Sequence, residues 1–209
     1  MNSSIKWRIV TLQAVIVAVL AFASGFALYE GAFVTGLVSD QLAAQKIFFP
    51  PQSAVVAGGA LDPAEFGDIT KYAGQQVDTG EKAKAYGNGF LGRHIAKIAG
   101  GLTYAQMGTL SGPVNAELAA TAKTDPNYAV LQGKLATIAG QKASLFTGEM
   151  LRGTLLNAWG WSQMAMYTTF AGLFMMLATL VVLGALVFEL FFADRKIESR
   201  AKVLKQAIA

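Results

Sequence analysis

The sequence predicts an all-α membrane protein in which two transmembrane helices flank a helical extracytoplasmic domain. Residues 9–29 contain no charged side chain, and residues 153–188 contain none either. A helix needs about 20 apolar residues to cross the roughly 30 Å hydrocarbon core of a bilayer, so each run is long enough. Between the runs, the alternation of apolar and polar residues that is typical of β-strands is missing.

These observations divide the 209 residues into five parts. The expected parts are a cytoplasmic N-terminal tail (1–8), a first transmembrane helix (9–33), an extracytoplasmic helical domain (34–160), a second transmembrane helix (161–192) and a basic cytoplasmic tail (193–209). The second uncharged run would be about 54 Å long as a helix, which exceeds the hydrocarbon core. We therefore expect its first part to belong to the outer domain or to project from the membrane.

The distribution of basic residues predicts the orientation. Lys6 and Arg8 precede the first run, and the tail after Ala193 carries five basic side chains against two acidic ones. Short basic segments next to spans stay in the cytoplasm, so both termini are predicted to be cytoplasmic. Residues 40–152 carry ten basic and nine acidic side chains without a basic stripe, which excludes a nucleic-acid partner. An outer domain without cysteine favours the plasma membrane of a bacterium.

A cleavable secretory signal is the alternative interpretation of the first run. Two basic residues, an apolar stretch and Ala21-Phe22-Ala23 imitate such a signal and its cleavage site. The apolar character continues beyond that site through Phe26 and Leu28. We therefore expect the segment to be retained as a transmembrane helix.

Two sets of side chains suit membrane helices. Aromatic and basic residues gather where headgroups are expected. The predicted membrane-interface residues are Trp7, Trp159, Trp161, Tyr167, Arg195 and Lys196. Small residues recur every four positions in the first span, which lets another helix approach closely. The predicted helix-packing residues are Ala23, Ala27, Gly31 and Thr35, unless they only reflect the abundance of alanine in this chain.

Capping signals predict the helices of the middle segment. An aspartate before proline begins a helix at residues 62–65, and another does so at residues 125–126. Residues 78–81 have the Asp-x-x-Glu spacing of a capping box, and residues 103–106 open a further helix. The Ser-Gly-Pro sequence at residues 111–113 is expected to separate that helix from an alanine-rich one.

The sequence predicts no catalytic residue, metal ligand or cofactor site. His94 is the only histidine, and a metal centre needs several converging ligands. The methionines of the second span are interpreted as apolar filler. Glu149 and Arg152 are three residues apart, so on a helix they are expected to form a juxtamembrane pair. A membrane enzyme that uses His94 or Glu149 is a third and weaker hypothesis.

A resemblance to a known group of proteins covers about residues 80–161. Residues 148–158 read Gly-Glu-x-Leu-Arg-Gly-x-Leu-Leu-Asn-Ala, residues 80–86 lead to His94, and residues 100–104 read Gly-Gly-x-Thr-Tyr. In these stretches the chain resembles small uncharacterised two-pass membrane proteins of actinobacteria. The resemblance implies a location and an architecture, and it implies no reaction.

The leading functional hypothesis is a non-catalytic accessory subunit of a larger bacterial membrane complex, with a respiratory or other energy-transducing complex as the expected setting. Such a subunit would act through helix packing and an outer cap. Its partners would be other integral membrane subunits, the lipid bilayer and further copies of itself. The alternative is a membrane-anchored ligand-binding or sensor protein associated with transport, which would need a closed apolar pocket with converging polar groups in its outer domain.

Overall fold

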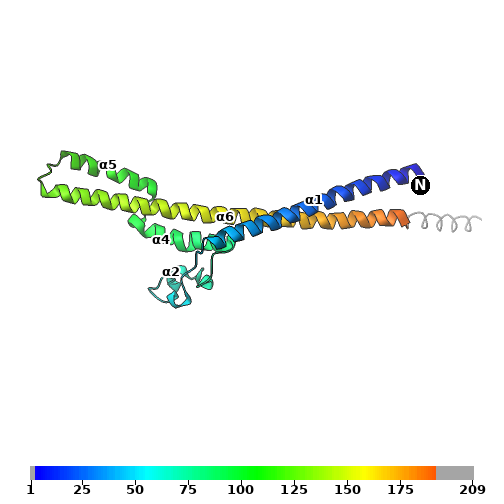
Figure 1. The fold of residues 1–209 in the computed structure, drawn as a ribbon, viewed down its shortest axis with the longest axis horizontal. Helices are drawn as coiled ribbons and strands as arrows, with labels where there is room; N and C mark the ends of the chain where they lie inside the picture. The colour runs from blue at the N-terminus through cyan, green and yellow to red at the C-terminus, as the bar shows by residue number, and fades with distance from the viewer. Residues whose placement is uncertain (1–2, 192–209) are drawn as a thin grey trace, which may run out of the picture. The chain divides into compact units, whose positions relative to one another are not determined.

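The computed structural model of the protein describes residues 3–191 (Figure 1). Within this range the chain is helical, and the only β pairing is an isolated antiparallel bridge between Phe48 and Gln76. Two long apolar helices flank a helical middle segment, which confirms the predicted fold class. The chain divides into two compact units. One comprises the residues up to Thr35 together with those from Met164 onward, and the other comprises Gly36–Gln163.

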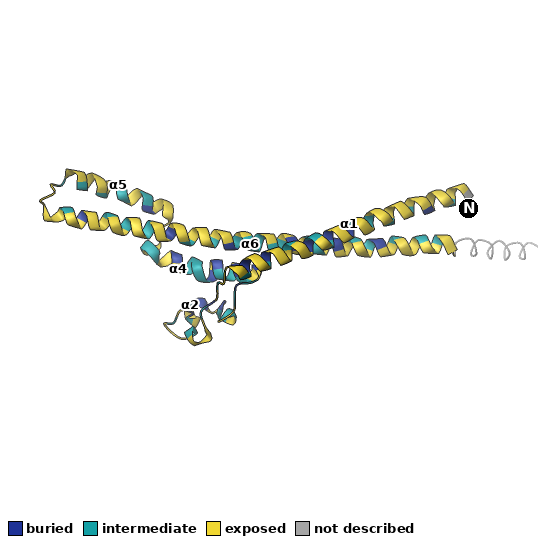
Figure 2. Ribbon diagram, in the orientation of Figure 1, coloured by how far each residue is buried: buried dark blue, intermediate teal, exposed yellow. Residues whose placement is uncertain are grey.

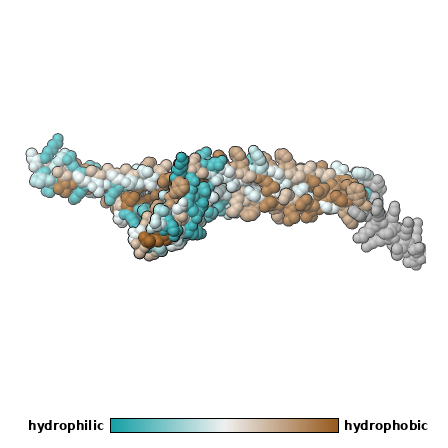
Figure 3. All heavy atoms as spheres, turned by 60° about the horizontal axis from the view of Figure 1, so that its bottom comes forward, coloured by the Kyte–Doolittle hydropathy of each residue, from teal (hydrophilic) through white to brown (hydrophobic). Residues whose placement is uncertain are grey.

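The two long helices are α1 (Ser3–Ala44) and α6 (Pro126–Phe191). Both are long and apolar enough to cross a membrane. Their surfaces within the first unit are largely exposed and apolar (Figures 2 and 3). Helix α6 runs without a break through 66 residues, so the second uncharged run continues a helix that begins well before it. Arg195, Lys196 and the predicted basic tail lie outside the described residues.

Within the first unit, α1 and α6 pack against each other through residues spaced alternately three and four apart. The sheltered residues of α1 are Val10, Gln13, Val17, Leu20, Ser24, Ala27, Gly31 and Val34. Those of α6 are Ala165, Thr168, Gly172, Met175, Thr179, Val182, Leu186 and Glu189. This 3–4 spacing is that of a coiled coil. We call the contact between these two rows of residues the seam.

Small residues let the two helices of the seam approach closely. A Cβ atom added at Gly31 would overlap the Thr169 side chain and lie 3.1 Å from the Ala165 carbonyl oxygen. One added at Gly172 would lie 3.1 Å from the Leu28 amide nitrogen. Residue numbers fall along α1 as they rise along α6, so the helices are antiparallel. Backbone approach of this kind is how apolar helices associate where lipid removes the hydrophobic driving force.

The four predicted helix-packing residues are placed differently from one another. Ala27 and Gly31 are buried in the seam, Ala23 is half-buried beside it, and Thr35 is exposed. The Thr35 hydroxyl donates a hydrogen bond to the Gly31 carbonyl oxygen at 2.7 Å. A row with uniform four-residue spacing drifts around a helix of 3.6 residues per turn, whereas the 3–4 alternation stays on one face. The helix that lies on Ala27 and Gly31 is the chain's own α6.

The second unit contains the end of α1, the part of α6 up to Gln163, and the short helical elements between them. In chain order these elements are the 3-10 helix η1 (Gln52–Ala54), α2 (Pro63–Phe66), the 3-10 helix η2 (Thr70–Tyr72), α3 (Gly80–Lys84), the π-helix η3 (Ala85–Leu91), α4 (Gly92–Lys97), the 3-10 helix η4 (Ile98–Gly101) and α5 (Tyr104–Ala120). A small core of Ile95, Met107 and Leu145 joins α4, α5 and α6.

Three of the predicted helix starts are confirmed. The Asp62 side chain accepts a hydrogen bond from the Ala64 amide at 2.9 Å, and Asp125 accepts one from the Asn127 amide at 2.8 Å. Thr103 forms a full capping box with Gln106, the third residue of α5. These caps satisfy amide groups that have no partner inside the helix.

The fourth start was predicted one residue too early. The N-cap of α3 is Thr79, whose hydroxyl accepts a hydrogen bond from the Lys82 amide at 3.3 Å. Asp78 instead pairs with the Lys82 ammonium group at 2.9 Å. The Glu81 side chain does not return to the helix start, because it bonds side chains of α6.

The predicted break at residues 111–113 is also wrong. Helix α5 continues through Pro113 to Ala120. Proline removes one amide donor and crowds the preceding turn, but helical bonds on both sides can persist at a bend. The Ser111 hydroxyl donates to the Gly108 carbonyl oxygen at 3.1 Å in this turn.

Candidate functional site

The segment from α3 to α4 lies along the part of α6 that precedes Met164, and glycines make the approach possible. A Cβ atom added at Gly80 would overlap the Ser162 side chain. At the other end of the contact, a Cβ atom on Gly148 would lie 2.8 Å from the Ile95 side chain. Leu155 is only 2% exposed between these two points. The contact therefore joins the stretches around residues 80–95 and 148–162, on which the resemblance to actinobacterial proteins depends.

A polar network centred on Glu81 connects α3 to α6. One oxygen of the Glu81 carboxylate accepts hydrogen bonds from Trp159 Nε1 at 3.1 Å and from Gln163 Nε2 at 3.0 Å. The Lys84 ammonium group lies 4.3 Å from the centre of the Trp159 ring. A cation in this position is attracted by the face of an indole. The indole of Trp159 is thus held by a carboxylate at its edge and by an ammonium group over its face.

Glu149 and Arg152, the predicted juxtamembrane pair, form an ion pair of 3.2 Å on α6. Arg152 also donates from Nε to the Asn88 side-chain oxygen at 3.0 Å. The ion pair is therefore linked to the π-helix η3 through Asn88. Both partners are partly exposed, with 36% and 47% of the Arg152 and Glu149 side chains accessible, so the pair contributes little to stability by itself.

The continuous helical segment from η3 to α4 brings three rings into one column, two from η3 and one from α4. Residues four apart lie on one face of a helix. The rings of Tyr86 and Phe90 are 5.0 Å apart between centroids, and those of Phe90 and His94 are 4.4 Å apart. Phe49 contacts Tyr86 at 5.2 Å, and Phe66 contacts His94 at 5.4 Å. Burial of the phenol in this cluster raises the pKa of Tyr86.

His94 lies at the exposed end of the ring column. Its Nδ1 atom is 2.9 Å from the Phe90 carbonyl oxygen, so the ring orientation is fixed by its own helix. Within residues 3–191, no group of three or more histidine, cysteine, aspartate or glutamate side chains could hold a metal ion. The geometry around His94 accordingly fits a packing role.

A charged clasp holds α2 and the following loop against α4. The two terminal guanidinium nitrogens of Arg93, Nη1 and Nη2, donate to the two carboxylate oxygens of Asp68 at 2.7 and 3.0 Å. This hydrogen bonding lowers the pKa of Asp68 and raises the pKa of Arg93. Lys97 pairs with Glu65 at 2.6 Å, and both cations lie near the Phe66 ring.

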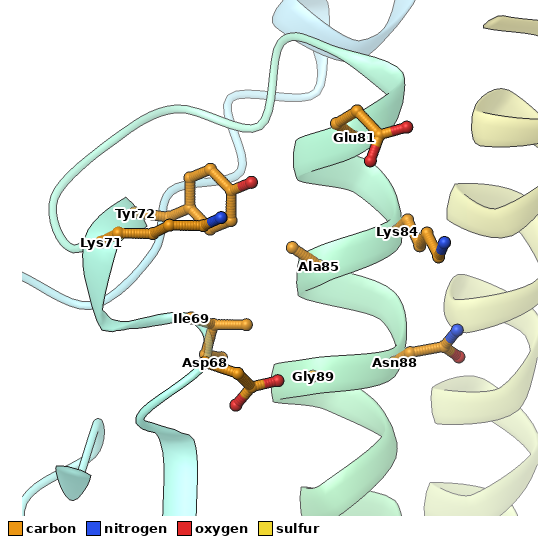
Figure 4. A pocket seen from close by; sticks show the side chains of 9 residues that line it. All are labelled: Asp68, Ile69, Lys71, Tyr72, Glu81, Lys84, Ala85, Asn88 and Gly89. Carbon is orange, nitrogen blue, oxygen red and sulfur yellow. The ribbon is translucent and has the colours of Figure 1, made fainter. Parts of the chain in front are cut away.

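An open cleft of about 230 Å³ lies between this loop and the helical segment that begins at α3 (Figure 4). Its lining residues are Asp68, Ile69, Lys71, Tyr72, Glu81, Lys84, Ala85, Asn88 and Gly89. Lys71 and Tyr72 approach from η2, and Ala85 projects from η3 toward them, whereas Glu81, Lys84 and Asn88 point toward α6 (Figure 4). The cleft is open and has both polar and apolar lining, unlike the closed apolar pocket that a conventional ligand-binding domain would need.

The predicted interface aromatics have different surroundings. Trp159 belongs to the Glu81 network, whereas Trp7, Trp161 and Tyr167 are 60%, 55% and 61% exposed. Sequence reasoning missed Glu81, Lys84 and Asn88 as a group. Their spacing of three and four residues could have indicated one polar helix face, but nothing in the sequence points to α6 as the surface that this face meets.

Comparison of the chain with protein-family models, curated proteins and solved structures found no match. Any functional proposal therefore has to come from the geometry of the chain itself.

Proposed function

We propose that the protein is a non-catalytic accessory subunit of a larger bacterial membrane complex. In this proposal α1 and α6 cross the plasma membrane, both termini are cytoplasmic, and the middle segment covers the outer surface of a partner. The observation that carries the proposal is an exposed, uncharged stripe on the outer part of α6. Its residues are Phe146, Met150, Gly153, Asn157 and Trp161, and we call it the outer stripe.

The outer stripe has the form of a helix-docking surface. At 100° per residue, its positions fall within a sector of about 80° on the helix. The three large side chains, those of Phe146, Met150 and Trp161, are 53%, 58% and 55% exposed. Gly153 lies between them, and a Cβ atom added there would meet nothing within 4 Å. The three large side chains are separated by four and eleven residues, and apolar anchors on one helix face are what an apolar groove or a second helix recognises.

The outer stripe also extends beyond the part of α6 that lipid can cover. The uncharged run of α6 would span about 54 Å, against roughly 30 Å of hydrocarbon. On the opposite side of this outer part, Leu155 is buried under the segment from α3 to α4. The Phe146 ring lies 5.7 Å from the Tyr104 ring of α5, so this end of the outer stripe is partly covered by the chain itself. The rest of the outer stripe is exposed, and large exposed apolar faces mark interaction sites.

Site-specific photocrosslinking in the native membrane tests the proposal. A photoreactive phenylalanine analogue at Met150 or Asn157 should crosslink to one defined membrane chain that also co-purifies in mild detergent. Gln132 and Thr137 are exposed polar positions on the same helix and serve as matched controls, at which the yield should fall to background. A particle that contains only this chain, with equal crosslinking at stripe and control positions, would overturn the proposal.

The proposed orientation has a separate test, because the natural chain has no cysteine. In single-cysteine variants, Lys123→Cys lies in the turn between α5 and α6, and Ser4→Cys lies near the start of α1. A membrane-impermeant maleimide should label Lys123→Cys in cells with a permeabilised outer envelope, and it should label Ser4→Cys only after lysis. Labelling of Ser4→Cys before lysis would exclude a cytoplasmic N-terminus.

A further inference from the structure

Helix α6 carries a second row of residues with coiled-coil spacing. Three members of the outer stripe, Met150, Gly153 and Asn157, are three and four residues apart. Steps of three and four residues continue this row along the unbroken helix to Ala185, and we call the residues from Met150 to Ala185 at these steps the heptad row. None of them is charged, and all are exposed except Gly160 and Ala178, which are half-buried. The heptad row is thus a continuous uncharged face beside the seam.

In the apolar part of α6, large and small side chains alternate along the heptad row. The large members are Tyr167, Phe174 and Val181, which are 61%, 73% and 66% exposed. The small members between and after them are Ala171, Ala178 and Ala185. Large side chains separated by alanines provide the knobs and holes through which two helices interdigitate.

The face of α6 on the other side of this span lacks the alternation. Leu173, Met176, Leu180 and Leu183 are also three and four residues apart and at least 40% exposed, but every one of them is large. At 100° per residue, Leu173 lies roughly 160° around the helix from Ala171. Contacts between membrane helices are enriched in small residues. The heptad row therefore has the composition of a helix contact, and the opposite face has that of a surface in lipid.

Asn157 is the only member of the heptad row that is neither apolar nor aromatic. Its side chain is exposed and forms no hydrogen bond within residues 3–191. Gly153 and Gly160 are its neighbours in the row, and a Cβ atom at either would meet nothing within 4 Å. Packing inside the chain therefore requires neither glycine, although glycine weakens a helix interior. Both leave room for a second backbone to approach on the two sides of Asn157.

We propose that the heptad row joins α6 to the α6 of a second copy of this chain, in a parallel pair around a two-fold axis. Copies inserted into one membrane in the same orientation have parallel α6 helices, so each residue of the row meets its own counterpart. The two Asn157 amides then face each other, and each can donate to and accept from the other. A single asparagine in an apolar heptad row fixes the register and specifies the number of strands.

The charges beside the heptad row are compatible with such a pair. Glu149 and Arg152 are next to Met150 and Gly153 in the chain, and they already pair with each other at 3.2 Å. Contact between two copies of the row therefore brings no unpaired like charges together. This inference rests on the proposed function, since it takes α6 as a membrane span and the outer stripe as an interaction surface. It adds that the partner of this surface is a second copy.

Disulfide trapping of the full chain in native membranes tests the inference, because the natural chain has no cysteine. A disulfide forms only where two Cα atoms come within about 7 Å. Met150→Cys and Ala171→Cys should therefore give a disulfide-linked dimer on mild oxidation. Leu173→Cys and Leu180→Cys are matched controls in the same span, and their dimer yield should be lower by about fivefold or more, since a two-fold axis through the heptad row separates them beyond that limit.

A second change tests the fit of the two helices. Adding Ala178→Phe to Ala171→Cys fills a hole of the row, so it should lower the dimer yield about fivefold, because overfilled contacts force backbones apart. Leu180→Phe adds volume on the opposite face and should leave the yield unchanged. All variants are compared at equal membrane insertion, measured by resistance to carbonate extraction.

The outcomes separate this inference from the proposed function. No dimer at either row position, or equal yields at row and control positions, would overturn the pairing of two copies. If the photoreactive group at Met150 then captures a different chain, the accessory role stands without the pairing. Dimers at the row positions with no other chain co-purifying would support the pairing and count against the accessory role.

Discussion

Replacing Gly80 with alanine should loosen the contact between α3 and α6. Gly80 is the first residue of α3 and faces Ser162. The new Cβ atom would overlap both Oγ and Cβ of Ser162, whereas the next nearest atom, the Trp159 Cα, would be 3.4 Å away in ordinary contact. The Ser162 hydroxyl also donates to the Trp159 carbonyl oxygen at 2.7 Å, so its position is fixed. The clash therefore requires one helix to move.

The cost of overpacking and the helix preference of alanine set the expected size of the effect. Overpacking in a tight contact costs about 1–3 kcal/mol. Alanine gains about 0.5–1 kcal/mol over glycine in a helix, so the net loss in Gly80→Ala should be about 0.5–2 kcal/mol. Ser162→Gly removes both overlapping atoms. The double variant should thus recover most of the loss, with a coupling free energy of about 1–3 kcal/mol.

Gly140→Ala is the matched control, because a Cβ atom at Gly140 on α6 would meet nothing within 4 Å. This change should stabilise the protein by up to about 1 kcal/mol. Hydrogen exchange measured by mass spectrometry on the full chain in detergent reports the local opening of residues 80–97. Faster exchange in Gly80→Ala that Ser162→Gly reverses is expected. Equal behaviour of Gly80→Ala and Gly140→Ala, or no rescue in the double variant, would refute the packing argument.

Three further predictions concern the middle segment. Trp159→Phe keeps a ring but loses the hydrogen bond to Glu81, so it should destabilise the α3 contact by about 0.5–1.5 kcal/mol in chemical unfolding. The pKa of Asp68 is lowered by Arg93, so the stability it adds is present above about pH 4 and is lost as the pH falls further. Asp68→Asn should reduce this loss of stability at low pH. The reduction should be about 1 kcal/mol or less, because the Asp68–Arg93 pair is partly exposed. The pKa of Tyr86 is raised by burial, so stability should fall as the pH rises above about 10, and Tyr86→Phe should remove that loss in a pH series of melting curves.

Local signals in the sequence predicted local structure well. The caps at Asp62, Thr103 and Asp125 act within three residues, so their side chains and the amides they satisfy are visible together in the sequence. The error at Asp78 arose because Thr79 competes for the same role, and because Glu81 is drawn to Trp159 by a contact 78 residues away in the chain.

Features that depend on packing could not be read in this way. The continuation of α5 through Pro113 depends on the balance between one lost hydrogen bond and the bonds on either side. The π-helix at residues 85–91 contains two glycines and has no sequence signature of its own. The Glu149–Arg152 pair was visible from its spacing, but its link to Asn88 crosses 64 residues and required the fold.

The small residues of α1 are expected from the sequence to contact another helix, and in the seam that helix is the chain's own α6. Two helices approach closely where their facing residues are small. Gly31 is such a residue, and it already faces the chain's own α6. In the proposed complex, a partner helix would therefore meet another face of α1. The exposed aromatic row at Phe22, Phe26, Tyr29 and Phe33 provides one, with neighbouring rings 6.4 and 6.3 Å apart and every side chain more than half exposed. The residues of this aromatic row are spaced four, three and four apart, which is the same alternation as in the seam. The row lies on a different face of α1. Helix α1 can therefore pack against α6 and still present a continuous apolar surface to lipid or to a second protein.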